Sequence, residues 1–359
     1  YLISDEEIIF ASETKAILKG LDKKPELNTQ LIDAYMSYGY IPGENTLHKG
    51  IKRLMPGHCA VIKGPKMEIR QWWDLKFDNK TDKGLDYYVT ESKHLLESAI
   101  DLRLRSDVPL GIFLSGGIDS SAVVGLLAER VPDKLKTFSI GYDFGNDFDE
   151  SKYARLVADK FNTDHHEIKI TPAQFKAFIP EYIKLMDEPV TEAAAISLFF
   201  VSKLAKENVT VALSGEGSDE IFAGYDLYRY MSVLEKYRSK VGQIGANFFS
   251  WLSNMVLGES HKISKYLSMA RLPLEQRYKG ISTYQEHHKT HLYRDDFKVS
   301  LKEQGQVNAT RFTSNLFNKV ADQEQLSKML YFDTKTWLVD DLLIKADRMS
   351  MGTSIELRV

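Results

Sequence analysis

Two short motifs combine glycine, hydroxyl and carboxylate residues in a pattern that suits phosphate chemistry. The first, FLSGGIDSS, covers residues 113–121, and the second, LSGEGSDEIFAGY, covers residues 213–225. In each motif an apolar run ends at a glycine turn, and acidic and hydroxyl side chains follow. Backbone N–H groups freed by glycine, next to a helix N-terminus, form a site that attracts anions. These residue types therefore favour the binding of a ligand through its phosphate groups.

The first motif lacks the lysine of a Walker A loop. Its glycine pair frees the backbone of residues 115–119 to cradle a pyrophosphate-sized anion, and the hydroxyl groups of Ser115, Ser120 and Ser121 can add hydrogen bonds. No lysine follows Gly117, so the loop does not grip a γ-phosphate as a Walker A loop does. Such a cradle suits an enzyme that expels pyrophosphate and keeps the nucleoside monophosphate. The alternative is a Gly-Ser turn that only caps a helix.

The second motif places several acidic side chains between glycines. Carboxylates this close together repel one another unless a cation lies among them. With both motifs at neighbouring strand ends, Asp119 and Asp219 could share a Mg²⁺ ion that bridges phosphate oxygens. Glu216 could then accept a proton or stabilise a cationic intermediate. The alternative is an acidic loop that only caps the helix at Asp219 and Glu220.

A segment with basic residues near the end of the sequence complements these acids. Residues 338–359, LVDDLLIKADRMSMGTSIELRV, place Asp341 and Lys345 four residues apart on a predicted helix, where the two side chains can meet. A salt-bridged helix explains this pattern. Binding of a substrate or a triphosphate explains it as well, because an anionic reactant needs cations that the two acidic loops do not provide.

Other chemistry-bearing residues favour structural roles. His287 and His291 stand four residues apart, but no glutamate follows the first histidine and no third ligand is evident, so a surface helix is favoured over a zinc site. Cys59, the only cysteine, excludes an intramolecular disulfide and lies in an apolar strand, which favours a structural thiol.

Composition excludes several classes of partner. A net charge of −3 with 27% charged residues indicates no broad surface for polyanions, so nucleic acid is not an expected partner. The longest apolar stretch, AAAISLFFV at 193–201, is too short to cross a bilayer. We therefore expect a cytoplasmic protein with no membrane partner.

Alternating strand and helix patterns predict the sheet that positions both motifs. Residues 1–75 show short strands, turns and two helical pieces, and a polar segment at 74–84 marks the expected domain boundary. Repeated strand–helix units then predict a doubly wound parallel sheet whose strand ends bring the two motifs together. The region 225–345 is expected to be mainly helical and part of the same domain. The expected strands are 108–114, 135–142, 165–170 and 209–213. The apolar face expected on a long helix from residue 85 consists of Leu85, Tyr88, Val89, Leu95, Leu96, Ala99 and Leu102.

The motifs SGGIDSS (115–121) and SGEGSDEIFAGY (214–225) and the ending DRMSMGTSIELRV (347–359) resemble the glutamine-hydrolysing asparagine synthetase family. FASETKAIL (10–18) and RLMPGHCAVIKG followed by QWWDL agree more weakly and look like the tail of a glutaminase domain. The resemblance implies an α/β fold, with a doubly wound parallel sheet of the pyrophosphate-loop ATPase (adenine nucleotide alpha hydrolase-like) type and C-terminal helices. An α+β class II glutaminase tail at 1–75 would precede this synthetase domain at 76–359.

The resemblance also implies a reaction and a site. Aspartate would attack the α-phosphorus of ATP and release pyrophosphate, and ammonia from glutamine would then convert β-aspartyl-AMP to asparagine. Asp119 and Asp219 would hold Mg²⁺, and Glu216, Asp219 and Lys345 would be catalytic. Leu114 and Ile140 would lie near the adenine of ATP. The full set of residues implied to bind ATP is Leu114, Ser115, Gly116, Gly117, Asp119, Ser120, Ser121, Ile140, Ser214 and Gly215.

Departures from the family pattern leave alternatives open. The N-terminal cysteine of the family's glutaminase is missing and Cys59 does not match it, so we expect a fragment that neither hydrolyses glutamine nor completes the synthesis efficiently. A related amidotransferase could adenylate a sugar acid or a β-lactam precursor instead of aspartate. A non-catalytic nucleotide-binding remnant is a further alternative. A tRNA-thiolating enzyme would need reactive cysteines and a basic face, and neither is visible in the sequence. The protein could assemble as a homodimer.

Overall fold

A five-stranded parallel sheet lies in one of two compact units of the computed structural model. The structure describes residues 1–4, 7–64, 66–77, 81–131, 133–143, 150–258, 261–281, 289, 291–303 and 309–359. We call the first unit the sheet unit; it comprises Asn79–Asp187, Thr191–Ser218 and Asp341–Val359. We call the second the helical unit; it comprises Tyr1–Asp78, Glu188–Val190 and Asp219–Asp340. The domain boundary expected near residue 75 stays a prediction.

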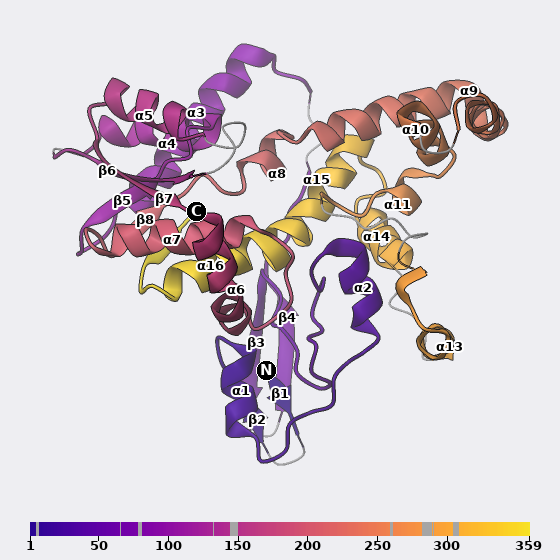
Figure 1. Cartoon of the computed structure of the whole chain (residues 1–359), viewed down its shortest axis with the longest axis horizontal. Coiled ribbons are helices and arrows are strands. Elements are labelled where there is room, and N and C mark those ends of the chain that lie inside the picture. Colours follow the sequence, from indigo (N-terminus) through magenta and orange to yellow (C-terminus); the bar gives the residue numbers. More distant parts are fainter. Residues whose placement is uncertain are drawn as a thin grey trace. The chain divides into compact units, whose positions relative to one another are not determined.

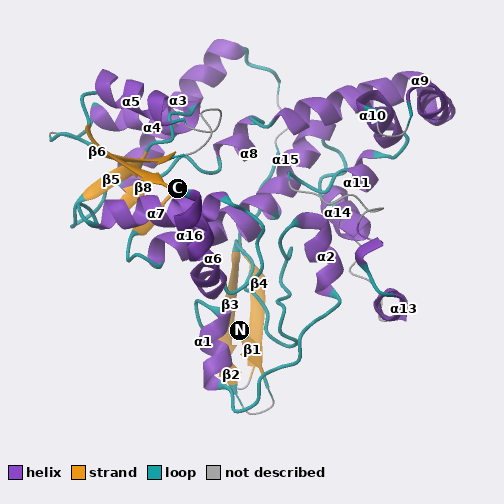
Figure 2. Ribbon diagram, viewed as in Figure 1, coloured by secondary structure: helices purple, strands orange, loops and turns teal. Residues whose placement is uncertain are grey.

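The strands of the sheet follow from short apolar runs rich in β-branched and aromatic residues. They pair in the order β7-β6-β5-β8-β9, and all four pairings are parallel (Figure 2). The predicted α/β class with a doubly wound parallel sheet is confirmed. The strands are β5 Leu110–Phe113, β6 Lys136–Tyr142, β7 Asp164–Ile170, β8 Val211–Leu213 and β9 Glu356–Arg358.

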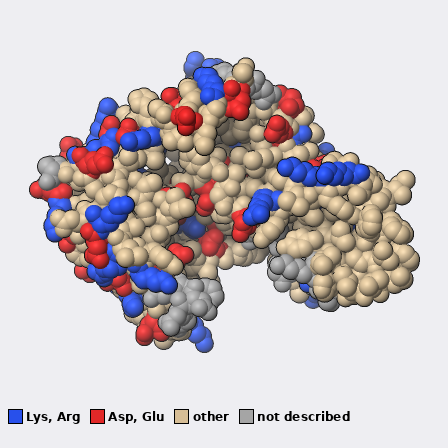
Figure 3. Space-filling view, turned by 90° about the horizontal axis from the view of Figure 1, so that it is seen from above, with Lys and Arg blue, Asp and Glu red and all other residues tan. Residues whose placement is uncertain are grey.

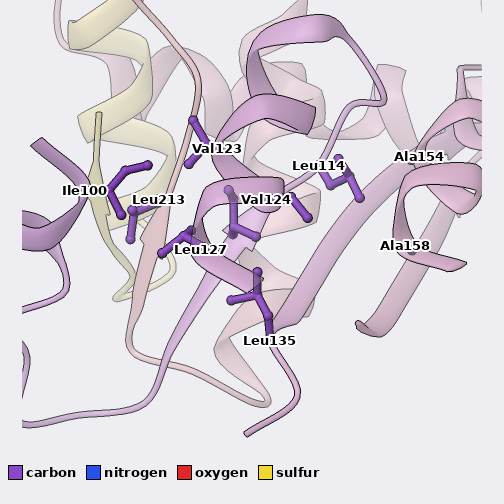
Figure 4. Packing of buried hydrophobic residues seen from close by; sticks show 10 residues of the cluster. Ile100, Leu114, Val123, Val124, Leu127, Leu135, Ala154, Ala158 and Leu213 are labelled. Atoms are coloured by element: carbon purple, nitrogen blue, oxygen red, sulfur yellow. The ribbon is translucent and has the colours of Figure 1, made fainter. Parts of the chain in front are cut away.

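Helices cover both faces of this sheet (Figure 1), and successive side chains along β5 belong to two different core clusters. Ile112 and Leu114 pack with the helices α3 to α5, in the cluster drawn in Figure 4. Phe113 points to the opposite cluster, which includes Val201 and Ala205 of α7. The helices of the first face are α3 Leu85–Arg103, α4 Ile118–Ala128 and α5 Ser151–Lys160. Those of the second face are α6 Pro172–Met186, α7 Ala194–Lys206 and α16 Leu343–Met351.

The strand order creates a switch point beside β5. From β5 the chain builds outward to β6 and β7 on one side, and it later adds β8 and β9 on the other side. In open α/β sheets, ligands bind beyond the carboxyl ends of the strands where the winding reverses. A ligand site is therefore expected at the carboxyl ends of β5 and β8.

Two apolar features of the sequence lie at the surface of the structure. The helix α3 forms as predicted, but its expected apolar face is exposed, with Leu85 at 77% and Val89 at 60%. Within the described part of α3, Ile100 is the residue whose side chain is fully buried, because packing against α4 involves the end of the helix. Cys59 is exposed rather than buried, because β3 pairs only with β4 and leaves that side chain uncovered.

The helical unit combines a small amount of β structure with many helices. A β-hairpin pairs β3 His58–Lys63 with β4 Lys66–Gln71, as the sequence predicts. Its other elements are β1 Leu2–Ile3, β2 Ile8–Ile9, α1 Thr14–Gly20, α2 Leu31–Tyr38, α8 Ser218–Phe222, α9 Asp226–Leu257, α10 Lys262–Ala270, α11 Leu274–Arg277, α13 Asp295–Glu303, α14 Ala309–Asn318, α15 Gln325–Lys335 and the π-helical turn Leu338–Leu342. Within the described residues, no helix has both the length and the apolar character that crossing a membrane requires.

A fully buried carboxyl group lies among the helices of this unit. Asp333 is 0% exposed and accepts hydrogen bonds from the hydroxyls of Tyr228, at 2.7 Å, and Tyr278. Burial raises the pKa of Asp333 to about 7, against the opposing effect of the two tyrosine donors. The folded protein thus keeps this carboxyl neutral up to about pH 7, whereas the unfolded chain ionises it near pH ~4. The contribution of this carboxyl group to stability is therefore fully present below about pH 4 and is lost as the pH rises to about 7.

Asp333→Asn is therefore expected to change the pH dependence of unfolding. The wild-type protein should lose stability relative to the variant between about pH 4 and about pH 7, by a few kcal/mol in all, because the variant has no proton to release at this position. Urea unfolding of both proteins across this range measures the difference. Burial also raises the pKa of Asp340, to about 6. Asp340 is present in both proteins, so its effect on stability cancels in the difference between them. A difference that stays constant with pH would contradict the expectation.

Candidate functional site

The loop after β5 leaves the N-terminus of α4 open. The residue before this helix is Gly117, and among the described residues no side chain caps the first N–H groups. The hydroxyls around the loop bond to one another and to its backbone: Ser115 Oγ lies 3.0 Å from Ser120 Oγ, and Ser121 Oγ donates to the carbonyl of Gly117 at 2.6 Å. Uncapped N–H groups at the positive end of a helix attract an anion. The loop therefore fits the phosphate groups of a nucleotide.

Gly116 holds this loop against the start of α5. Its φ of +84° lies in the left-handed region that favours glycine. A Cβ atom at this position would lie 2.5 Å from the backbone nitrogen of Ala154 and 2.7 Å from the Cβ of Tyr153. Because backbone atoms occupy that space, only glycine fits without a shift of the loop or of α5.

The second glycine loop touches the first. The N–H of Ser214 donates to the carbonyl of Arg358 at 2.9 Å and so continues the pairing of β8 with β9. A Cβ on Gly215 would lie 3.0 Å from the nitrogen of Ser120 and 3.1 Å from the Cβ of Asp119. β5 and β8 are also hydrogen-bonded neighbours. The prediction that the two motifs meet at adjoining strand ends is confirmed.

The rest of the second motif folds tightly around Asp219. A Cβ on Gly224 would lie 1.8 Å from Asp219 Oδ1, and the N–H of Gly224 donates to the carbonyl of Asp219 at 3.1 Å. Ala223 adopts a left-handed backbone with a φ of +58°. Glu220 is 1% exposed and accepts a hydrogen bond of 2.7 Å from the hydroxyl of Tyr225. These contacts hold the carboxylate of Asp219 in one place, whereas Glu220 has a structural partner.

Three further predicted residues differ in their accessibility. Leu114 is 1% exposed, and its carbonyl accepts a hydrogen bond of 2.6 Å from Ser139 Oγ. Its side chain belongs to the core, so any contact with an adenine would involve the backbone. Ile140 and Glu216 are half-buried, and Ile140 packs against the core on the face of α7. Their proposed contacts with ATP or with an intermediate stay predictions.

Lys345 forms an ion pair that the sequence did not reveal. Its side chain is 7% exposed, and its Nζ lies 3.8 Å from Glu192 Oε2. The other oxygen of Glu192 accepts a hydrogen bond of 3.3 Å from the N–H of Ala194, at the start of α7. A helix that leads into a parallel strand begins at the carboxyl edge of the sheet, and both α7 and α16 do so. The pair therefore lies at the same edge of the sheet as the glycine loops.

The acids before Lys345 divide between the two units. Asp340 belongs to the helical unit, where its Oδ1 lies 2.9 Å from Arg53 and its Oδ2 accepts from the N–H of Gly43 at 2.8 Å. Burial raises the pKa of Asp340 despite this arginine. The π-helical turn Leu338–Leu342 breaks the regular helix that the sequence predicts before Lys345. Asp340 thus has structural partners, and Glu192 is the ion-pair partner that the structure gives to Lys345.

The proposed metal ligands stay predictions. Asp119 lies in the sheet unit and Asp219 in the helical unit. Among the described residues, no group of three or more His, Cys, Asp or Glu side chains could hold a metal ion. Mg²⁺ binds proteins through one or two carboxylates together with phosphate oxygens, so each of these residues is of a type that suits the ion. His291 is exposed, and the other histidines of that stretch, His287 and His288, lie outside the described residues.

Comparisons with known proteins agree with this geometry. Residues 91–359 match the family model described as asparagine synthase, and residues 1–73 match the model described as a glutamine amidotransferase domain.

Named relatives include proteins called asparagine synthetases, in agreement with the family match. Asparagine synthetase (glutamine-hydrolyzing) 1 of Bacillus subtilis (strain 168) is 32% identical over 366 residues, which cover 100% of this chain and 55% of that protein. A protein of Methanocaldococcus jannaschii, provisionally named as a second asparagine synthetase of that kind, is 33% identical over 368 residues, covering 100% of this chain and 68% of its own length. Amidase chyE of Penicillium rubens is 29% identical over 248 residues, covering 64% of this chain and 36% of its own. The chain thus spans little more than half the length of the Bacillus relative.

Proposed function

The chain belongs to the asparagine synthase family, and on that premise we propose that its sheet unit activates a carboxylate, aspartate in the first instance, by adenylation with ATP. The matched domain implies the use of ATP. The β-aspartyl-AMP intermediate then reacts with ammonia to give asparagine and AMP. The ammonia comes from glutamine, as the name of the Bacillus relative and the match to a glutamine amidotransferase domain suggest.

One observation supports this proposal most directly. The two glycine loops are in contact at the switch point of the sheet, where Gly215 lies against Asp119 and Ser120. The open N-terminus of α4 offers N–H donors to the phosphates, and Asp119 stands in the first turn of the same helix. A site that holds phosphates without a Walker A lysine suits cleavage between the α- and β-phosphates. Adenylation of a carboxylate is a reaction of this type.

Each residue of the site then has a role in the chemistry. The carboxylate oxygen of the acceptor attacks the α-phosphorus, and the bond to pyrophosphate breaks. The N–H groups of the first loop and the ammonium of Lys345 bind the negative charge that collects on the leaving pyrophosphate. Glu216 accepts a proton from ammonia as the new C–N bond forms and AMP leaves. Asp119, in the first turn of α4, would supply a carboxylate ligand to Mg²⁺, and the ion would neutralise charge on the phosphate oxygens; a ligand role for Asp219 stays a prediction.

A second acceptor is supported by one of the comparisons. The match to Amidase chyE covers 64% of this chain, so the conserved architecture extends to a protein named for a different activity. Relatives of one fold often act on different substrates. A sugar acid or a β-lactam precursor therefore remains the alternative to aspartate, and a nucleotide-binding remnant without catalysis is the alternative to both.

Exchange of labelled pyrophosphate into ATP tests the adenylation step. We expect magnesium-dependent exchange that aspartate stimulates, with Glu216→Gln reducing amide formation from ammonia by about a hundredfold while exchange persists, because a general base contributes about 10²–10⁴ to a rate. Glu207→Gln, an exposed position after α7, is the matched control and should behave as the wild-type protein. Exchange with another carboxylate alone would favour the second acceptor. Tight ATP binding without exchange for any carboxylate would refute the proposal.

A further inference from the structure

The helices α9 and α10 form a hairpin that packs through small side chains. α9 bends at Gly242, whose φ is +66°, and the part that follows lies against α10. Ser250 Oγ lies 3.1 Å from Ser268 Oγ, and Ser264 Oγ donates to the carbonyl of Ser253 at 3.1 Å. Later residues of α9 thus contact earlier residues of α10, so the two helices run antiparallel. Hydroxyl groups of Ser250, Ser264 and Ser268 therefore lie between the two helices.

Several large apolar side chains of the part of α9 after the bend are exposed. Ile244, Phe248, Trp251 and Met255 are spaced by four, three and four residues and so share one side of α9. Their exposed fractions include 86% for Ile244 and 59% for Trp251. A soluble helix normally buries such a side, and contiguous apolar surface marks a contact site. We call this set the apolar face of the hairpin: Ile244, Phe248, Trp251 and Met255.

The segment that contains this face is rich in basic residues. Residues 236–272 contain six lysines and arginines and one acidic residue, a net charge of +5 in a chain whose net charge is −3. Lys236, Lys240, Lys265 and Arg271 are exposed. In Figure 3 the right-hand part of the molecule, where Figure 1 places the hairpin, shows mostly uncharged surface with a row of Lys and Arg along one edge. The hairpin therefore joins an aromatic apolar face to a local excess of positive charge.

We propose that the apolar face of the hairpin docks on an anionic lipid surface. Helices that lie in a membrane interface combine Trp, Phe and aliphatic side chains on one side with Lys and Arg around them. Anionic headgroups attract each exposed lysine or arginine, and the apolar side chains leave water for the acyl boundary. Pairing of two hairpins would bring two charges of +5 together, which disfavours a second copy as the partner. This contact differs from the sequence-based expectation of no membrane partner, and it does not depend on the proposed function.

The helix α3 provides an internal comparison for this proposal. It also exposes apolar side chains, among them Leu85 at 77% and Val89 at 60%. Its sequence, however, carries four acidic residues and two basic ones. An anionic surface would repel this helix, so exposure of apolar groups alone does not predict binding there.

Sedimentation with lipid vesicles tests the proposal. The wild-type protein should bind vesicles of phosphatidylcholine mixed with phosphatidylserine, bind vesicles of phosphatidylcholine alone less well, and lose binding as salt rises. The double variant Phe248→Ser, Trp251→Ser should bind at least about tenfold more weakly. Both side chains are exposed, at 54% and 59%, so the variant should fold, and thermal unfolding verifies this. The control variant Leu85→Ser, Val89→Ser on α3 should bind as the wild-type protein does.

Other outcomes would overturn the proposal. These are the absence of binding to anionic vesicles by the wild-type protein, equal binding by the double variant, and equal binding to neutral vesicles. Light scattering after size exclusion adds a further check. If the wild-type protein is an oligomer and the double variant is a monomer, the apolar face makes a protein–protein contact instead.

Discussion

Lys345→Met is expected to reduce ATP–pyrophosphate exchange by about two to three orders of magnitude, because loss of one preorganised charge at a reacting phosphate has an effect of that size. Methionine keeps the length of the buried stem and removes only the cation. The substitution should leave folding intact, since Glu192 is partly exposed, at 24%, and can be hydrated after losing its partner. Exchange rates at saturating ATP and aspartate, with thermal unfolding as the check on folding, measure the effect.

Two further variants separate catalysis from general electrostatics in this experiment. Lys203→Met removes an exposed lysine from α7 in the same unit and should leave exchange unchanged. Glu192→Gln should cause an intermediate loss of about tenfold, because the carboxylate orients the ammonium but does not touch the reactants, and partly exposed pairs contribute modestly. If Lys345→Met and Lys203→Met gave the same rate, Lys345 would have no role in the reaction.

Gly116→Ala is expected to abolish measurable ATP binding. The new Cβ would lie 2.5 Å from the backbone nitrogen of Ala154, so either the loop or the first turn of α5 must move. The left-handed φ of +84° adds a cost of about 1 kcal/mol for any residue other than glycine. A displaced loop no longer presents its N–H groups at the end of α4, and we expect a loss of affinity of at least about a hundredfold. Calorimetric titration with ATP measures it.

The control for Gly116 is a glycine with the same backbone conformation but without close neighbouring atoms. Gly84 has a φ of +83°, and nothing lies within 4 Å of a Cβ built on it. Gly84→Ala should therefore show the conformational cost alone, as a small loss of stability with unchanged ATP affinity. The difference between the two variants isolates the contact of the loop with α5. Wild-type affinity in Gly116→Ala would show that the phosphate loop is not where ATP binds.

The pattern of the sequence predicts the sheet and the position of the glycine loops. β5 with α4, β6, α5 and β7 lie where apolar runs, glycines and helical periods indicate, because each of these signals acts over a few neighbouring residues. The meeting of the two loops also followed from the sequence, since parallel strands direct their carboxyl ends to one edge. The roles of Glu216, Asp119 and Asp219 came from motif chemistry and stay predictions.

Tertiary structure decided which partners these residues have and which surfaces are covered. Glu192 precedes an apolar run with no motif around it, and only the packing of α7 against α16 brings it to Lys345. Asp340 pairs with Arg53, which is distant in the sequence. Periodicity identified the residues that share a side of α3, yet it could not show that this side is exposed. Local patterns determine which side chains lie together on one element, whereas burial and ion pairing depend on elements that meet only in the folded chain.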